Sequence, residues 1–173
     1  AIDHEDLFPA QTDLAELVGL IRAHQIGGIR EIGDISLSPL MPTAFAFGRM
    51  MRYFSRIYDP EKKVLGVDIG SRSTTIAASK AGSLALNVFP YGVGGGIMDV
   101  LAKQSVQEVV RWLAEDIRLD VVKDYLWQKS LFPDSVPMTH EALLIEQALA
   151  RLILQIAMRQ AADRYSDLGE SFE

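Results

Sequence analysis

The chain of 173 residues contains no cysteine. This absence excludes disulfides, thiolate metal sites and cysteine nucleophiles. Histidine is scarce as well, because only His4, His24 and His140 are present and they are far apart in the sequence. Their spacing does not match a metal site, so we expect each of them at the surface or at a helix end.

Basic charge and long apolar runs are also lacking. The 17 basic and 23 acidic residues leave a net charge of −6, which predicts no nucleic-acid partner. No apolar run reaches about 18 residues, and no basic and then apolar leader opens the chain. We therefore expect a cytoplasmic protein without a membrane span.

The composition that remains is that of a globular protein, with 49% hydrophobic and 23% charged residues. The length suits one folded unit, so we expect residues 1–173 to form a single domain. Because the chain starts with Ala1 instead of methionine, we expect it to be excised from a longer protein.

One stretch, VLGVDIGSRSTTIAAS at residues 64–79, organises the remaining predictions. The apolar run at 64–67 is typical of a buried strand that ends at Asp68. Gly70 then allows a sharp turn at unusual backbone angles, and the chain returns as a second strand. The pattern predicts a strand, turn and strand with a carboxylate beside the turn.

The chemistry of this turn suits a phosphate and a magnesium ion. Its amides and hydroxyls can bond phosphate oxygens, and the Asp68 carboxylate can hold a hydrated Mg²⁺ and take the catalytic role. The candidate phosphate-binding residues are Asp68, Gly70, Ser71, Arg72, Ser73, Thr74 and Thr75. The alternative is an ordinary hairpin with a polar turn.

Hydrophobic periodicity predicts the remaining elements. We expect strands at 64–69, 73–80 and 83–90, paired antiparallel as a meander, with a hairpin turn at Ala81-Gly82. We expect helices at 13–23, 43–58, 97–102, 105–113, 117–129 and 139–163, and a short strand or extended link at 29–35. The fold class is therefore α/β, with a three-stranded antiparallel meander and a helical C-terminal half.

Two of these helices carry more apolar surface than a small sheet can cover. We expect the helix at 43–58 to be buried on two sides, and the helix around 143–158 to be apolar outside a stripe of Gln147, Arg151, Gln155 and Arg159. The excess surface predicts a two-fold dimer of the chain, or docking of a missing lobe, through one of the two helices.

Three further patterns leave alternatives open. The glycines of residues 92–96 suit a close approach to a nucleotide phosphate or base, or else a flexible joint. Asp116, Asp120 and Asp124 lie four residues apart and form either a metal cluster or a solvated face, and the intervening basic residues favour the solvated face. Ser105 and Glu108 predict a capping box.

The segment VDIGSRSTT resembles the phosphate motif of the actin-like ATPase superfamily, which includes sugar kinases and heat-shock chaperones. Within that superfamily, residues 32–91 resemble the MutL family associated with glutamate mutase. The matching features are Pro42-Thr43 before a helix, the DIG turn, and the alanine-rich helix from Glu146 onward. Arg72 and Ser73 depart from the small residues of the family, and Ile76-Ala77 replace its usual Asp or Lys.

The resemblance implies one lobe of a ribonuclease-H-like, actin-like ATPase fold that binds ATP and Mg²⁺. It also implies service to a cobalamin-dependent mutase as a chaperone or reactivating factor. The superfamily binds nucleotide between two lobes, and this chain has a single DxG loop, so we expect calorimetry to detect no binding by these residues alone. The alternative is a non-catalytic relative of the fold that acts in assembly.

Overall fold

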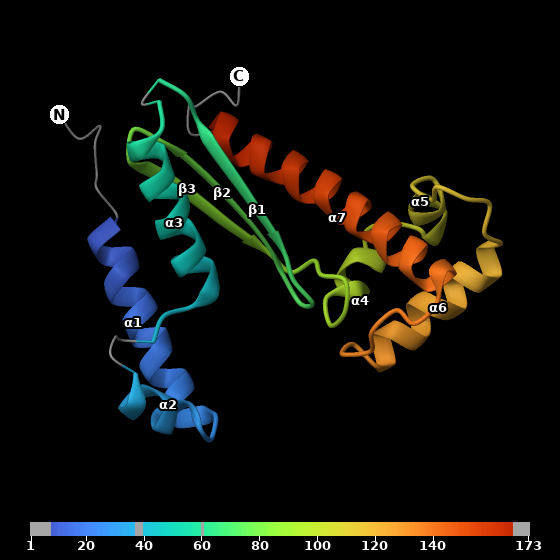
Figure 1. Ribbon diagram of the computed structural model, residues 1–173, viewed down its shortest axis with the longest axis horizontal. Helices are drawn as coiled ribbons and strands as arrows, with labels where there is room; N and C mark the ends of the chain where they lie inside the picture. Colours follow the sequence, from blue (N-terminus) through green and yellow to red (C-terminus); the bar gives the residue numbers. More distant parts are fainter. Residues whose placement is uncertain (1–7, 37–39, 60, 168–173) are drawn as a thin grey trace.

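A three-stranded antiparallel sheet lies between helices on its two faces (Figure 1). The computed structural model describes residues 8–36, 40–59 and 61–167. The strands β1 (Val64–Ile69), β2 (Thr74–Lys80) and β3 (Ser83–Phe89) pair in the order β1-β2-β3. This confirms the predicted meander to within one residue at each strand end.

The turn between β2 and β3 is the predicted hairpin turn. Ala81 has a φ of 49° and Gly82 a φ of 86°. Two successive residues in the left-handed region make the type of turn whose twist matches the flanking strands.

One face of the sheet is covered by α3 (Thr43–Ile57). Gly48 allows the helix to approach β3 closely, because a Cβ there would lie 3.1 Å from Leu84. The outer side of α3 is open, with 59% of Tyr53 and 56% of Ile57 exposed. The expectation that this helix is buried on two sides is wrong, since no other described element covers its outer side.

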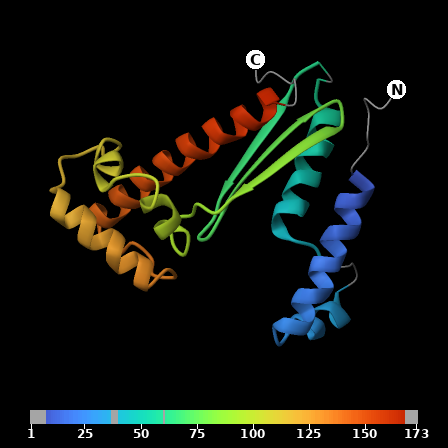
Figure 2. The ribbon, with the colours of Figure 1, turned by 180° about the vertical axis from the view of Figure 1, so that it is seen from behind.

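The other face of the sheet is covered by α7 (His140–Asp167), which supplies much of the core. The helix starts where the Thr139 hydroxyl accepts a hydrogen bond from the Ala142 amide at 3.1 Å. Leu152 is only 2% exposed. Most of the apolar surface of α7 is thus covered by its own chain, because the helix continues past the sheet to α5 and α6 (Figure 2).

Three helices lie between β3 and α7 in the sequence: α4 (Ile97–Leu101), α5 (Val106–Val110) and α6 (Leu119–Leu131). Of these, α5 and α6 pack against α7, and α4 packs against α6. All three were predicted, although α5 ends earlier and α6 runs two residues later than expected. The predicted capping box of α5 does not form. Ser105 makes no side-chain cap bond, and the Glu108 carboxylate instead pairs with Arg111 at 2.8 Å.

Two helices precede α3 in the described part of the chain, α1 (Phe8–Gln25) and α2 (Ile29–Ile35). The expected helix at 13–23 lies within α1, but the expected strand at 29–35 is wrong. Gly28, with a φ of 87°, reverses the chain, and its carbonyl accepts the Ile32 amide at 3.0 Å. That bond starts a helix on a segment that has no neighbouring strand to pair with.

Within the described part of the chain, no helix combines the length and the apolar character that crossing a membrane requires.

Candidate functional site

The connection between β1 and β2 is a tight turn of residues 70–73. Ile69 and Thr74 form the last ladder pair, and the Gly70 amide donates to the Ser73 carbonyl at 2.9 Å. Gly70 does not have a positive φ, so the unusual backbone angle expected for it is not found. A Cβ at Gly70 would lie 3.2 Å from the Ser73 carbonyl oxygen, which is a tight contact but not an impossible one.

Three successive amides of this turn have no acceptor among the residues that the structure describes. No hydrogen bond made within residues 8–36, 40–59 and 61–167 uses the amide of Ser71, Arg72 or Ser73 as its donor. Ser71 and Arg72 are exposed, and Ser73 is half-buried. Successive amides at the surface of a turn are a common arrangement for holding an anion.

Asp68 lies in β1 next to this turn and is half-buried. It is paired across the ladder with Thr75, which is only 3% exposed. Side chains alternate along a strand, so Asp68 and Gly66 share the face of the sheet that α3 covers. Among the described residues, no hydrogen bond or ion pair reaches the Asp68 carboxylate.

Thr74 has a structural contact that the sequence did not indicate. Its hydroxyl donates to the Tyr91 carbonyl at 2.8 Å, and the residue is fully buried. This bond ties the start of β2 to the segment after β3. Thr74 is therefore engaged within the protein, in contrast to the amides of the turn.

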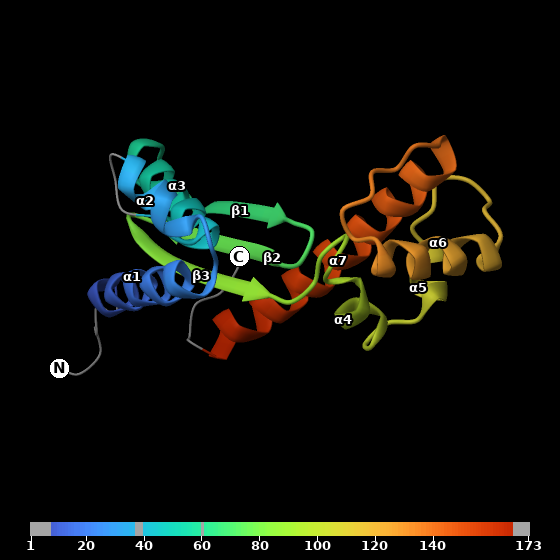
Figure 3. The same ribbon diagram turned by 90° about the horizontal axis from the view of Figure 1, so that it is seen from below.

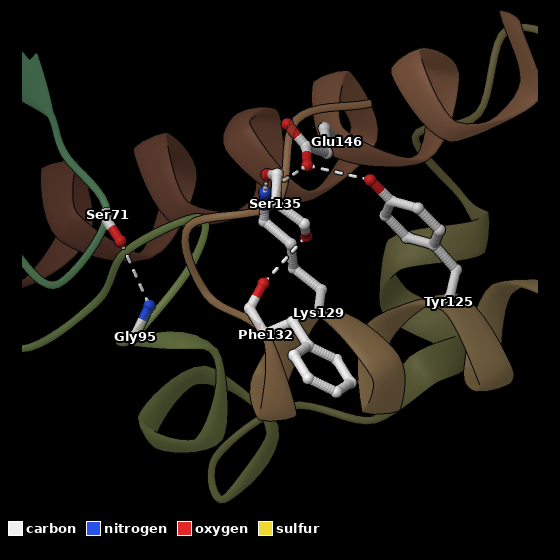
Figure 4. A network of polar contacts seen from close by, with 7 residues as sticks. All are labelled: Ser71, Gly95, Tyr125, Lys129, Phe132, Ser135 and Glu146. Carbon is white, nitrogen blue, oxygen red and sulfur yellow. Dashed lines mark hydrogen bonds and ion pairs between the residues drawn. The ribbon is translucent and has the colours of Figure 1, made fainter. Parts of the chain in front are cut away.

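The glycine-rich segment at 92–96 lies directly against the turn. The Ser71 carbonyl accepts the amides of Gly94 at 2.9 Å and Gly96 at 3.0 Å, and the Gly70 carbonyl accepts the Val93 amide at 3.1 Å. The Ser71 hydroxyl accepts the Gly95 amide at 3.2 Å (Figure 4). These four bonds fix the carbonyl side of the turn.

The glycines are required by this close backbone approach. A Cβ at Gly92 would lie 2.2 Å from the Ser71 carbonyl oxygen, and one at Gly96 would lie 2.5 Å from the Arg72 carbonyl oxygen. At Gly94 a Cβ would lie 2.6 Å from the Pro133 carbonyl oxygen. The segment approaches another group closely, as the sequence indicated, but that group is the neighbouring turn. This packing against the turn accounts for the glycines.

The loop that contains Pro133 is fixed by a buried polar network that joins α6 and α7 (Figure 4). Lys129 forms an ion pair with Glu146 at 2.7 Å and donates to the Ser135 carbonyl. Tyr125 donates to Glu146 at 2.8 Å. Burial, reinforced by this bond to the carboxylate, raises the pKa of Tyr125 above its ordinary value.

Sequence reasoning missed this network. A usable signal was present, because Tyr125 and Lys129 are four residues apart in α6 and a carboxylate occurs in the apolar part of α7. Buried charges in proteins are paired, so a lysine and a glutamate on two core helices predict each other.

The three aspartates at 116, 120 and 124 do not share one helix face. Asp116 precedes α6, and Asp120 and Asp124 lie on it. All three are exposed, and Asp120 pairs with Arg118 at 3.1 Å. The described residues contain no group of three or more carboxylates and histidines arranged to hold a metal ion.

These features define a mixed α/β protein in which a three-stranded antiparallel sheet carries a candidate anion-binding turn at one end. A family model described as MutL protein matches residues 1–171. The chain therefore belongs to the MutL family, the one associated with glutamate mutase. No curated protein matches it. No solved structure matches it.

Proposed function

We propose that the turn between β1 and β2 binds the phosphates of a magnesium nucleotide, ATP, as part of an actin-like ATPase. The observation that carries the proposal is that, among the described residues, neither the amides of Ser71, Arg72 and Ser73 nor the nearby Asp68 carboxylate has a hydrogen-bond partner. Hydrogen bonds from residues 93–96 to Gly70 and Ser71 fix the backbone of the turn in the unliganded protein. Preformed amides lose little conformational freedom on binding.

The residues present fit a magnesium ion that reaches the site with its nucleotide. Mg²⁺ keeps several waters and is held by one or two carboxylates together with substrate phosphates. Asp68 supplies one carboxylate, and Arg72 places a positive charge on the exposed turn. Asp68 would hold the ion through its water shell, and the ion would supply positive charge that polarises a bound phosphate. The ribonuclease-H-like lobe is the fold that this function implies.

Membership of the MutL family suggests a biological role for such a nucleotide site. We propose that the protein acts as a chaperone or reactivating factor for a cobalamin-dependent mutase. A second phosphate loop does not occur in this sequence, so the contacts of one turn limit the affinity.

The experiment is a titration of the isotope-labelled chain with Mg-ATP, followed through the amide resonances of residues 68–75. The expected result is a progressive shift of the Ser71, Arg72 and Ser73 amides at millimolar nucleotide. Asp68→Ala should weaken binding by about 1.5–3 kcal/mol, because hydrogen bonds to charged groups contribute about that much.

Asp116→Ala removes an exposed aspartate away from the turn and serves as the control, for which we expect unchanged affinity. The proposal would be refuted if the three amides stayed in place at about 10 mM Mg-ATP. It would also fail if Asp68→Ala bound as well as the unmodified chain.

A non-catalytic role in assembly is the second candidate. It is favoured by the apolar surface of α1, where 60% of Leu14, 52% of Leu17 and 63% of Leu20 are exposed. Under this alternative the Asp68 substitution has no effect on nucleotide, and the turn is only a structural hairpin.

A further inference from the structure

Three arginines and a tyrosine of α3 line a surface hollow of about 280 Å³, namely Arg49, Arg52, Tyr53 and Arg56. They are three or four residues apart from one another along the helix, so they share one helix face. The helix contains no acidic residue. This concentration of positive charge is unusual in a chain whose net charge is −6.

The turn between β2 and β3 positions two of these arginines. The Arg52 Nε donates to the Gly82 carbonyl at 2.7 Å. Arg56 packs directly on Gly82, because a Cβ there would lie 2.5 Å from the Arg56 Nε. The turn is itself tied to α3, since the Gly82 amide donates to the hydroxyl of the fully buried Ser55 at 3.1 Å. Both guanidinium groups therefore contact a turn that is fixed to their own helix.

The charges of the outer two arginines are not neutralised by carboxylates. Neither Arg49 nor Arg56 joins an ion pair within the described ranges. Asp59, the nearest acidic residue along the chain, pairs with Lys62 and does not line the hollow. A favourable interaction with the helix dipole explains a basic residue in the last turn, such as Arg56, but not Arg49.

This hollow is separate from the candidate nucleotide turn between β1 and β2. A meander places its two turns at opposite ends of the middle strand, and β2 spans about 20 Å at about 3.3 Å per residue. Figures 1 and 3 show α3 on the face of the sheet opposite α7, with the two turns at opposite ends of the strands. An anion in the hollow is therefore not the phosphate proposed for the β1–β2 turn.

We propose that the hollow on α3 binds the diphosphate group of a small soluble ligand. Guanidinium groups stay charged and form paired hydrogen bonds with phosphate oxygens. Arg49 and Arg56 are about 10.5 Å apart along the helix, at a rise of about 1.5 Å per residue, which suits two linked phosphates better than one carboxylate. Tyr53, which is 59% exposed, offers a hydroxyl donor and an aromatic face in the same hollow. The proposal does not depend on nucleotide binding at the β1–β2 turn.

The test is a titration of the isotope-labelled chain with sodium pyrophosphate in the absence of magnesium, followed through the side-chain Nε–H resonances of the arginines. Those of Arg49, Arg52 and Arg56 should shift progressively as pyrophosphate reaches millimolar concentration. Arg49→Gln with Arg56→Gln should raise the dissociation constant at least about tenfold, because charge-assisted hydrogen bonds from two guanidinium groups are lost. Added salt should weaken binding as well, since it screens exposed charges.

The matched control is Lys123→Gln with Arg159→Gln, which removes the same charge at exposed positions of α6 and α7. It should bind pyrophosphate like the unmodified chain. The Arg52 Nε–H resonance remains in every variant and reports on the hollow, and circular dichroism verifies that each variant is folded. The amides of residues 71–73 are followed in the same samples, so binding at the β1–β2 turn is distinguished from binding on α3.

Three results would overturn the proposal. Arginine resonances of α3 that stay in place at millimolar pyrophosphate would show that the hollow holds no diphosphate. An equal loss of affinity in the control variant would show a diffuse attraction to positive charge. Binding of the chain to vesicles of equal parts phosphatidylcholine and phosphatidylserine, without a response to pyrophosphate, would assign the arginines to a membrane surface instead.

Discussion

Among the described residues, Ser71 makes more hydrogen bonds to the glycine-rich segment than any other residue of the turn. Its carbonyl accepts two amides, and its hydroxyl accepts a third. These bonds use the acceptors of the turn, and the amides of residues 71–73 donate no hydrogen bond among the described residues. A serine in this position therefore fixes the turn through its carbonyl and hydroxyl oxygens, and its amide is not used in these bonds.

The first prediction at the residue scale concerns Gly94→Ala. The added methyl group would meet the Ser71 hydroxyl at 2.4 Å and the Pro133 carbonyl at 2.6 Å, so the backbone must move. We expect a loss of about 1–3 kcal/mol in the free energy of unfolding, the usual cost of overpacking. Urea denaturation followed by circular dichroism measures it.

Gly27→Ala is the matched control, because nothing lies within 4 Å of a Cβ there and its φ is not positive. Its stability should change by less than about 0.5 kcal/mol. Equal stability of the two variants would show that residues 92–96 yield easily and do not hold the turn.

At the scale of elements, α6 and α7 are joined by polar as well as apolar contacts. The ion pair between Lys129 and Glu146 leaves 6% and 16% of the two side chains exposed. Such a pair contributes little net stability relative to apolar residues, but each partner depends strongly on the other. The loop that follows α6 depends on it too, since Lys129 also holds the Ser135 carbonyl.

Glu146→Ala should therefore destabilise the protein by about 3–5 kcal/mol, because it leaves the Lys129 charge buried without a counter-ion. Thermal and urea unfolding provide the measurement. The double variant Lys129→Met with Glu146→Leu should recover most of the loss, because no charge then remains in the interior.

Glu141→Ala, at an exposed position one helix turn or more away, should change stability by about 0.5 kcal/mol or less. A Glu146→Ala variant as stable as this control would mean that water or another group compensates Lys129.

At the scale of the whole molecule, burial is distributed unevenly along the chain. The core gathers around β2 and α7, where Ile76, Leu149 and Ile153 are at most marginally exposed. By contrast α1 leaves much of its apolar face open, and residues of α1 and α2, together with Leu40, line a hollow of about 350 Å³. Few buried apolar contacts mean low local stability.

Hydrogen exchange followed by mass spectrometry should reflect this difference. We expect peptides from α1 to exchange at least about a hundredfold faster than peptides from the middle of α7, whose opening approaches global unfolding. The measurement belongs at low micromolar concentration, where association cannot protect α1. Equal protection of α1 and α7 would show that α1 is held by contacts beyond those of the described residues.

Much of the local structure was determined by the sequence itself. The alternation of apolar residues in 83–90, the Ala81-Gly82 pair and the run at 64–67 are short-range signals, and each strand and its turn formed where they indicated. The spacing of apolar residues in the sequence also predicted the helices α3, α6 and α7. The carboxylate of Asp68 beside a polar turn was also visible in the sequence, because a strand end and its turn are neighbours in the chain.

The tertiary structure decided what each group faces. Thr74 looked like a phosphate ligand, but folding brings it to the Tyr91 carbonyl, which lies 17 residues away. The sequence suggested that the glycines of residues 92–96 form a ligand-binding loop or a flexible joint. In the folded protein this segment packs against the turn of residues 70–73, and the glycines leave room for the backbone at Ser71. Residues 29–35 became a helix because no sheet edge was there to pair with them. The periodicity of apolar residues predicts which side chains are buried. Which residues pack against them or bond to them depends on contacts between segments that are distant in sequence.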